Sequence, residues 1–370
     1  MKKTLVIVGL AVLSTSAHAT KARIEALGTN ANLYMKDSRN VFRNAATINS
    51  NKNYIVTEWG QAVKSDVVGT PRAEGGFFRE MGSFAYGLYL GDEGSKNATR
   101  EDAAVTPGYL AQDNALDLFI GGDAGLQWGA QLHYANSSSE TAVAEAKRTN
   151  SAFGLGLGMV MGEMEAYANV DLSDKSKGDG TTAANEASRK PSFTIGGAYN
   201  WSGYTFFAEV VSGKSEVKEG TETATDKDFN VLVGAGRVME INPTARVFGN
   251  AAVSMTKNET NDGANPATTN KTTNTIMPLT FGFETDATSW LALRGSLSQN
   301  VLLNNKKVEA KAGAAAGTTT KTTNAATTTV NAGASLTFGK LALDGSIGVM
   351  GTGTLNTDNL MSRVGVIYNF

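Results

Sequence analysis

The chain has no cysteine and only 6 prolines among its 370 residues, and these absences exclude several classes of protein. Without cysteine it can form neither a disulfide framework nor a thiolate metal site. No stretch after residue 19 holds the roughly eighteen consecutive apolar residues of a transmembrane helix. The formal net charge of −2 leaves no basic surface on the scale that nucleic-acid binding needs.

What the chain does have is a two-residue alternation of apolar with polar or small side chains. In one segment, Leu126, Trp128, Ala130, Leu132 and Tyr134 alternate with Gln127, Gly129, Gln131 and His133. The same period recurs from Ser83 to the end of the chain, while helical periodicity is almost absent. Such strands are typical of a transmembrane antiparallel β-barrel, whose apolar side chains face lipid and whose polar side chains face the lumen.

The connections between these segments alternate in length. Short connections, such as 162–163 and 339–340, are followed by long polar ones, such as 213–227, 257–274 and 304–324. In outer-membrane barrels the short turns are periplasmic and the long loops extracellular. The long segments rich in Thr, Asn and Ala are expected to be flexible surface loops.

Counting the alternating segments predicts about fourteen strands. They lie near residues 83–91, 115–121, 124–136, 150–161, 164–172, 191–199, 204–212, 228–239, 245–255, 275–284, 290–300, 326–338, 341–350 and 360–370. A further hairpin from Tyr54–Gly60 and Gly76–Met81 would make sixteen, which is the alternative. Both counts are even, as single-chain bacterial barrels require.

The first residues predict export. Lys2 and Lys3 precede an apolar run at 5–13, and Ala17-His18-Ala19 fits a signal-peptidase site. We therefore expect a signal peptide at 1–19, a plug or constriction segment at 20–75 and the transmembrane barrel at 76–370. The proposed plug has broken periodicity and mixed charge, including Lys36, Asp37, Arg39, Arg43 and Glu58. The predicted location is the bacterial outer membrane.

The last eight residues form a strand with Val364, Val366, Tyr368 and Phe370 on one face; Ile367 is the exception to the alternation. This ending resembles the C-terminal strand by which the barrel-assembly machinery recognises its clients. The chain as a whole resembles Gram-negative outer-membrane β-barrel proteins, in particular the porin-like channels. The resemblance implies a passive channel, and it implies that these four residues are an assembly signal.

A second resemblance covers residues 22–48. The string at 22–28, then Asp37 and the string at 41–46, are similar to the N-terminal segment of FadL-type and PorV-type barrels. Those families have fourteen strands and an N-terminal hatch folded into the lumen, often with an Asn-Pro-Ala sequence. Here Ala45 stands in place of the proline, so the residue that would fix the hatch backbone is absent.

The alternation also predicts which residues line the lumen. The inward set includes acids, bases and polar residues: Asp117, Gln127, Gln131, His133, Glu165, Asp171, Glu209, Arg246, Glu284, Arg294, Asp344 and Arg363. On the lipid face a mid-depth Arg or Lys would cost roughly 2 to 4 kcal/mol, so the charges are expected inside. They could be ion pairs that stabilise the wall or the source of an electric field across a pore.

No enzymatic activity is predicted. His133 is the only histidine after residue 19, and no Gly-x-Ser-x-Gly elbow accompanies it. Asp171, Asp174 and Asp179 lack the spacing of an EF-hand calcium loop. We therefore expect no catalytic residues, no metal site and no cofactor.

Three functions remain open at this point. The first is a porin-like channel for passive diffusion of small polar solutes and ions. The second is a FadL-type transporter of hydrophobic molecules, and the third is a structural or surface-interaction barrel with a sealed lumen. The expected partners are outer-membrane lipid and lipopolysaccharide, the barrel-assembly machinery and small solutes, with no nucleic acid; the sequence predicts no particular oligomeric state.

Overall fold

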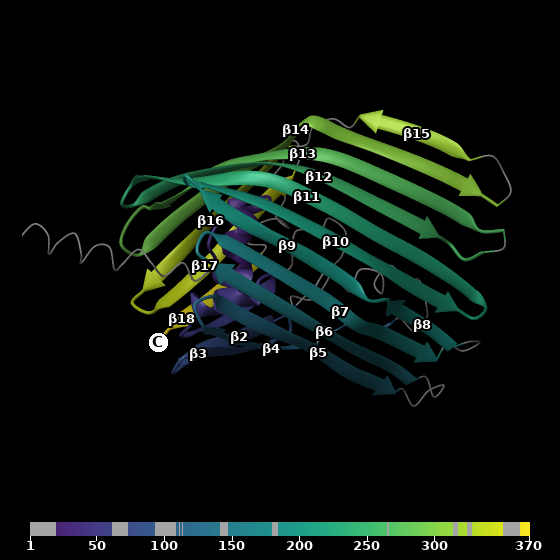
Figure 1. Ribbon diagram of the computed structural model, residues 1–370, viewed down its shortest axis with the longest axis horizontal. Helices are drawn as coiled ribbons and strands as arrows, with labels where there is room; N and C mark the ends of the chain where they lie inside the picture. The colour runs from purple at the N-terminus through teal and green to yellow at the C-terminus, as the bar shows by residue number, and fades with distance from the viewer. Residues whose placement is uncertain are drawn as a thin grey trace, which may run out of the picture.

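The strands form one closed barrel that encloses the N-terminal helices (Figure 1). The structure is a computed structural model, and it describes residues 20–60, 73–92, 109–110, 112, 114–140, 147–179, 184–264, 266–313, 317–323, 328–350 and 363–370. The signal peptide predicted at 1–19 lies outside the described residues.

The sheet is antiparallel and contains eighteen strand segments. It closes because β1 pairs with β2 on one edge and with β18 on the other. The segments are β1 (Tyr54–Gly60), β2 (Ala73–Met81), β3 (Phe84–Leu90), β4 (Leu116–Asp123), β5 (Gln127–Glu140), β6 (Lys147–Met161), β7 (Met164–Asp179), β8 (Ala184–Arg189), β9 (Ser192–Trp201), β10 (Tyr204–Glu219), β11 (Glu222–Asn242), β12 (Ala245–Asn261), β13 (Thr268–Asp286), β14 (Leu291–Ala312), β15 (Thr318–Thr323), β16 (Thr328–Phe338), β17 (Leu341–Met350) and β18 (Arg363–Asn369).

These segments make sixteen barrel strands. β8 and β9 both lie between β7 and β10, and β15 and β16 both pair with β14, so each of these two pairs is a single interrupted strand. The expected count of fourteen is corrected to the alternative of sixteen, because Tyr54–Gly60 and the stretch that includes Gly76–Met81 form the β1–β2 hairpin. Their inward positions hold the apolar residues Tyr54, Val56 and Phe78, which obscure the usual alternation in the sequence.

The outer surface of the barrel is apolar. Large hydrophobic side chains stay exposed at alternate positions, among them Ile120, Leu157, Phe206, Val233 and Phe281. The intervening residues on the same strands are largely buried or half-buried against the interior. Such a surface is unfavourable in water and favourable in hydrocarbon, so it is the lipid-facing wall.

Several strands continue far beyond the length that spans a bilayer. The segments β10–β14 contain 16, 21, 17, 19 and 22 residues, whereas about ten suffice to cross. The regions 213–227, 257–274 and 304–324, expected as loops, are therefore mostly strand, and the long strands run out together at one end of the barrel (Figure 1). Threonine is β-branched and suits a pleated, half-exposed ribbon, which explains the difference.

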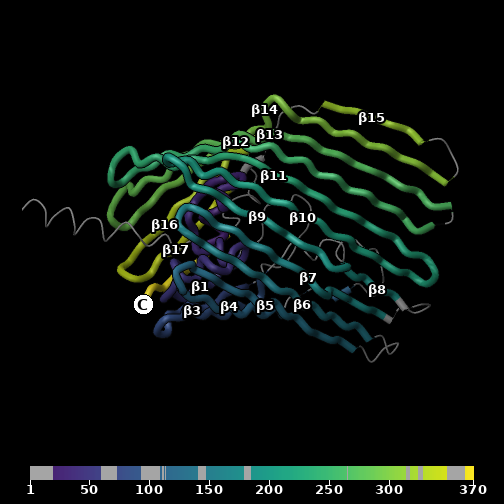
Figure 2. The backbone as a smooth tube through the Cα atoms, in the orientation of Figure 1, coloured from purple at the N-terminus to yellow at the C-terminus, as the bar shows by residue number. Residues whose placement is uncertain are grey.

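The N-terminal residues 20–53, here called the lumenal segment, lie inside the barrel (Figure 2). They form α2 (Lys21–Leu27), α3 (Ala31–Tyr34), η1 (Ser38–Phe42) and η2 (Ala45–Asn49). The barrel begins at Tyr54, earlier than the boundary expected at residue 76. The lumenal segment is shorter than the sequence suggested because its last twenty or so expected residues include β1 and the start of β2.

Candidate functional site in the barrel lumen

Polar side chains cap three of the four helical turns of the lumenal segment. Thr20, Asp37 and Asn44 cap α2, η1 and η2, accepting backbone N–H groups at 3.3, 2.8 and 3.1 Å. Such caps satisfy amide groups that would otherwise lack partners at a helix start. They give a segment with little regular structure a defined path through the lumen.

The segment touches several sides of the barrel wall. α2 packs on β14, β16, β17 and β18, α3 packs on β10 and β11, and η2 packs on β3 to β6. Two apolar clusters fill these contacts: one joins Leu33 and Tyr34 to Phe207 and Phe248, and the other joins Val41 and Ile48 to residues of the wall. The segment therefore spans the lumen.

Glycines on the inner wall allow this close approach. A Cβ atom at Gly129 would overlap the backbone of Ala45, and one at Gly158 would overlap the Asn44 side chain. A Cβ at Gly333 would lie 2.5 Å from that of Ala26. Some of the inward-facing glycines thus mark where the wall meets the lumenal segment.

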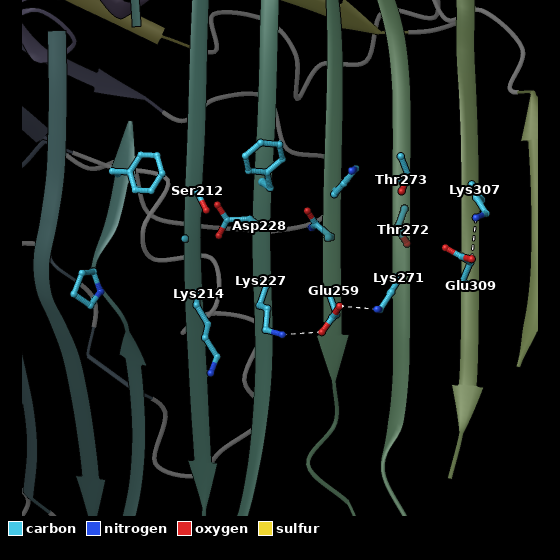
Figure 3. Close-up of a pocket in the computed structure, with 16 residues that line it drawn as sticks. Ser212, Lys214, Lys227, Asp228, Glu259, Lys271, Thr272, Thr273, Lys307 and Glu309 are labelled. Atoms are coloured by element: carbon cyan, nitrogen blue, oxygen red, sulfur yellow. Dashed lines mark hydrogen bonds and ion pairs between the residues drawn. The ribbon is translucent and has the colours of Figure 1, made fainter. Parts of the chain in front are cut away.

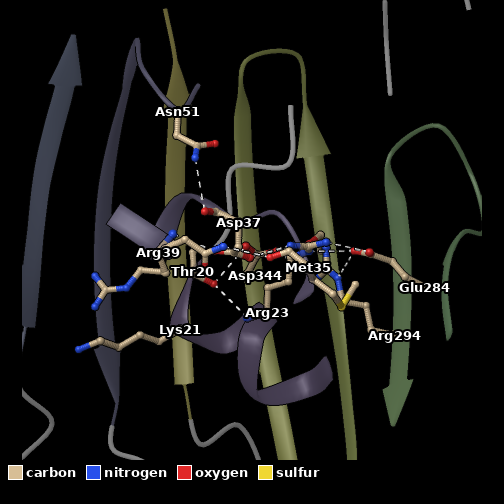
Figure 4. A network of polar contacts seen from close by, with 12 residues as sticks. Thr20, Lys21, Arg23, Met35, Asp37, Arg39, Asn51, Glu284, Arg294 and Asp344 are labelled. Atoms are coloured by element: carbon tan, nitrogen blue, oxygen red, sulfur yellow. Dashed lines mark hydrogen bonds and ion pairs between the residues drawn. The ribbon is translucent and has the colours of Figure 1, made fainter. Parts of the chain in front are cut away.

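A buried ion network joins α2 to the wall (Figure 4). Arg23 contacts Asp37 at 2.7 Å within the segment, and it donates two hydrogen bonds to Glu284 on β13, at 3.0 and 2.9 Å. Glu284 also accepts from Arg294 at 2.6 Å. Arg294 then contacts Asp344 at 3.3 Å.

This first network is balanced in charge. Its bases are Arg23, Arg246 and Arg294, and its acids are Asp37, Glu284 and Asp344. Arg246 is the most exposed member, at 34% for its side chain, whereas the side chains of the other five are all below 10%. Burial of charges is tolerated only when each is paired, as these are.

A second network ties the same segment to the first hairpin. Arg39 contacts Asp92 at 2.9 Å and Glu58 at 3.4 Å, and Lys21 pairs with Glu74 and with Asp92, the latter at 3.3 Å. Burial alone would raise the pKa of Asp92, but Arg39 and Lys21 outweigh it and hold that pKa at about 2. The Asp92 carboxylate therefore stays ionised throughout the physiological range.

Single hydrogen bonds and ion pairs attach the lumenal segment to the wall at other places. Asn44 donates to Glu165 at 3.3 Å, and Asn169 donates to the Arg43 carbonyl at 2.9 Å. On the other side of the barrel, Glu25 accepts from Arg363 at 2.5 Å. The lumenal segment is thus bound to the wall by polar contacts in at least four places.

The twelve residues predicted to line the lumen all lie on inward-facing positions, but in separate groups. Arg246, Glu284, Arg294 and Asp344 belong to the first network, while Glu165 and Arg363 contact the segment singly. Tyr167 donates to Glu209 at 2.7 Å, and Ser192 donates to Asp171 at 3.0 Å. Gln127 has the same parity on β5 as the other inward residues of that strand.

His133 belongs to a third group on the wall. Its Nδ1 lies 2.8 Å from Asp117 and its Nε2 lies 3.1 Å from Gln112, while Gln131 donates to Asp117 at 2.8 Å. With both ring nitrogens engaged by these side chains, His133 is held as part of the wall. It has no serine in hydrogen-bond contact among the described residues.

The sequence did not assign the partners of these charges. Arg23, Glu25, Glu74 and Asp92 were not singled out, although they complete the ion networks. The mixed charge of residues 20–53 was the available signal. These charged residues pair with wall residues that can lie more than 200 positions away in the sequence, as Arg23 does with Glu284. A local sequence pattern does not reveal such pairs.

A cavity of about 230 Å³ remains between the lumenal segment and strands β10–β13. Six polar residues line it: Thr29, Asn30, Asn32, Glu209, Asn230 and Ser254. The four apolar ones are Leu33, Leu232, Ile276 and Pro278. Polar residues thus outnumber apolar ones around the gap.

The described residues contain no helix of the length and hydropathy needed to cross a membrane. Nor do they bring three or more His, Asp or Glu side chains together in a way that could hold a metal ion.

Comparison with solved structures gives distant similarities. No protein-family model matches the chain, and no curated protein matches it. Among solved structures, the siderophore receptor PirA from Acinetobacter baumannii is 8% identical with a TM-score of 0.38, over 86% of this chain and 66% of that one. OmpT of Vibrio cholerae is 11% identical with a TM-score of 0.38, and an anion-selective porin from Comamonas acidovorans is 12% identical with a TM-score of 0.36; each match covers 86% of this chain and 97% of the other.

The architecture of the chain itself carries the conclusion. A closed antiparallel sheet has no free edge, and its outer surface is apolar while its lumen is polar. The exposed rings of Tyr199, Trp201, Tyr204, Trp290 and Tyr368 lie at or beside the short turns, where an interfacial aromatic girdle is expected. The chain is an outer-membrane β-barrel protein.

Proposed function

We propose that the protein is a porin-like channel through which small polar solutes and ions diffuse passively, with the lumenal segment as its constriction. Sixteen strands are enough to enclose an aqueous lumen. The segment occupies part of that lumen, so the passage is narrower than the barrel. As a passive channel, the protein would catalyse no reaction and need no cofactor.

The observation that carries this proposal is the polar lining of the gap beside the lumenal segment. Asn30 and Asn32 on the segment lie with Asn230 and Ser254 of the wall around the cavity of about 230 Å³. Amide and hydroxyl groups can replace part of the hydration of a small polar solute. A path for hydrophobic molecules would instead need a continuous apolar pocket beneath the segment, and the apolar clusters there are filled by side chains.

Single-channel recording in planar bilayers tests the proposal. The full-length protein should produce stepwise ion currents. Ser254→Trp would fill the polar gap and should lower the conductance at least twofold. The neighbouring Val253→Trp is the matched control, because Val253 faces lipid and a ring there leaves the lumen unchanged.

Two results would contradict the proposal. Electrically silent bilayers with a heat-modifiable, folded barrel would favour a sealed structural barrel. Equal conductance for the Ser254 and Val253 variants would show that ions do not pass beside the lumenal segment.

A further inference from the structure

The outer wall of the barrel carries a basic hollow on the extended part of the long strands. Its volume is about 750 Å³, and it extends from Phe193 on β9 across the outward face of the five neighbouring strands β10 to β14 (Figure 3). Each of these strands contributes one lysine, and together they form what we call the lysine row: Lys214, Lys227, Lys257, Lys271 and Lys307.

The lysine row faces away from the lumen. On β11, Lys227 has the parity of Phe229 and Val233, which are exposed. The opposite parity holds Leu232, which is buried against the lumenal segment. The cross-strand register places Lys214 opposite Lys227 and Lys257 opposite Phe229, so these lysines share the outward face.

The height of the row matches the outer edge of the hydrocarbon layer. Met239, near the periplasmic end of β11, and Phe229 are both outward-facing and lie ten residues apart. At ~3.3 Å per residue and a tilt of ~40°, this separation corresponds to about 25 Å along the membrane normal, the usual height of the apolar band. Lys257 is level with Phe229, and Lys227 is two residues further out.

Positive charge is in excess at this level. Lys190 lies beside the row, which makes six lysines against the three outward-facing glutamates Glu216, Glu259 and Glu309. Glu259 is shared between Lys227 at 2.8 Å and Lys271 at 3.1 Å. Lys257 has no ion pair with any described residue. The remaining acid that borders the hollow, Asp228, has the inward parity of Leu232 and is paired with Arg189 at 3.0 Å.

The register also sets lysines directly against each other. Lys214 is opposite Lys227 across β10 and β11, and Lys307 is opposite Lys321 across β14 and β15. Like charges in directly opposed positions destabilise a sheet. An anion held between them would remove this repulsion.

We propose that the hollow binds the phosphorylated glycolipid of the outer leaflet, with its phosphates at the lysine row. Phe193 and Phe229 line the membrane side of the hollow and would contact the first part of the acyl chains. Lysine ammonium groups at a membrane interface attract anionic headgroups, and the apolar wall below accepts hydrocarbon. The site is independent of conduction, since the side chains of the lysine row face away from the lumen.

Lipid titration of the folded, full-length protein tests the site. Native mass spectrometry would count bound bisphosphorylated lipid A and its dephosphorylated form in the same detergent. The triple variant Lys227→Gln, Lys257→Gln, Lys271→Gln should bind the phosphorylated lipid roughly tenfold more weakly or worse. The matched control is Lys175→Gln, Lys177→Gln, Lys311→Gln, which removes three exposed lysines outside the hollow and should bind normally.

Each other outcome counts against the proposal. Equal binding of the two lipids would show that the phosphates are not recognised. If both triple variants bound the phosphorylated lipid equally weakly, binding would depend on the overall charge of the protein and not on a specific site at the lysine row. Absence of bound lipid together with a change of oligomeric state in the lysine-row variant would identify the face as a contact between copies of the chain. Heat-modifiability checks that every variant is folded.

Discussion

Arg23 and Glu284 form a two-pronged ion pair inside the barrel, with N to O distances of 3.0 and 2.9 Å, although they are 261 positions apart in the sequence. Arg23 belongs to the lumenal segment and Glu284 to the wall strand β13. The pair therefore couples the position of the constriction to the barrel.

Replacing Arg23 with leucine should loosen the lumenal segment. The change leaves Asp37 buried without its guanidinium partner, and loss of one member of a buried pair costs about 3 to 5 kcal/mol. We expect the free energy for opening of residues 20–53, measured by hydrogen exchange, to fall by about 3 kcal/mol. Arg246→Leu is the control, because Arg246 is one-third exposed and binds the same glutamate; it should cost less than about 1 kcal/mol. Similar losses in both variants would contradict the coupling role of Arg23.

Adding a methyl group at Gly129 should displace η2. The new Cβ of Gly129→Ala would overlap the Ala45 backbone, which cannot move without shifting the segment. Overpacking of this kind costs about 1 to 3 kcal/mol. The expected result is faster hydrogen exchange of residues 44–50 with little change in the barrel strands. Gly345→Ala, whose Cβ would meet only a carbonyl 4.0 Å away, should leave the exchange unchanged.

The second ion network predicts a dependence on acid pH. The folded pKa of Asp92 is about 2, below its unfolded value of about 3.9. Its stabilising contribution, roughly 2 to 3 kcal/mol, is thus fully present above about pH 4 and is lost as the pH falls toward 2. The protection factors of the α2 and η1 amides, which are the intrinsic exchange rate divided by the observed rate at each pH, should fall over that interval in the natural chain. In Asp92→Asn these protection factors should already be lower at pH 7 and should change less between pH 4 and 2; an identical profile for the two proteins would refute this role.

Substitutions at neighbouring residues of the final strand, β18, should affect the yield of folded barrel differently. Tyr368 is exposed on the lipid side, and Phe370 has the same outward parity, whereas Ile367 is buried in an apolar cluster with the lumenal segment. Tyr368→Asp and deletion of Phe370 should therefore lower the yield of heat-modifiable barrel in the outer membrane, because both alter the face proposed for the assembly machinery. Asn369→Ser keeps a small polar side chain and should fold nearly normally. Equal yields for the three variants would count against the assembly role of this face.

The two-residue period was enough to predict an outer-membrane barrel and the orientation of most wall residues. The reason is local: in a strand, parity alone decides whether Val364 and Val366 face lipid or Asp344 and Arg294 face the lumen. The even strand number and the short periplasmic turns followed from the same spacing.

Only the tertiary structure decided which residues meet. β1 is a barrel strand because it pairs with β18, more than 300 positions later, and a short segment with an inward glutamate has no local feature that reveals such pairing. Ile367 breaks the alternation because its inward side chain is buried in an apolar cluster that includes Val41 and Ile48 of the lumenal segment. In the same way, Glu284 and Glu58 of the wall are in ion pairs because α2 and η1 bring Arg23 and Arg39 to them. Long-range contacts of this kind depend on the closed barrel and leave no periodic signal in the sequence.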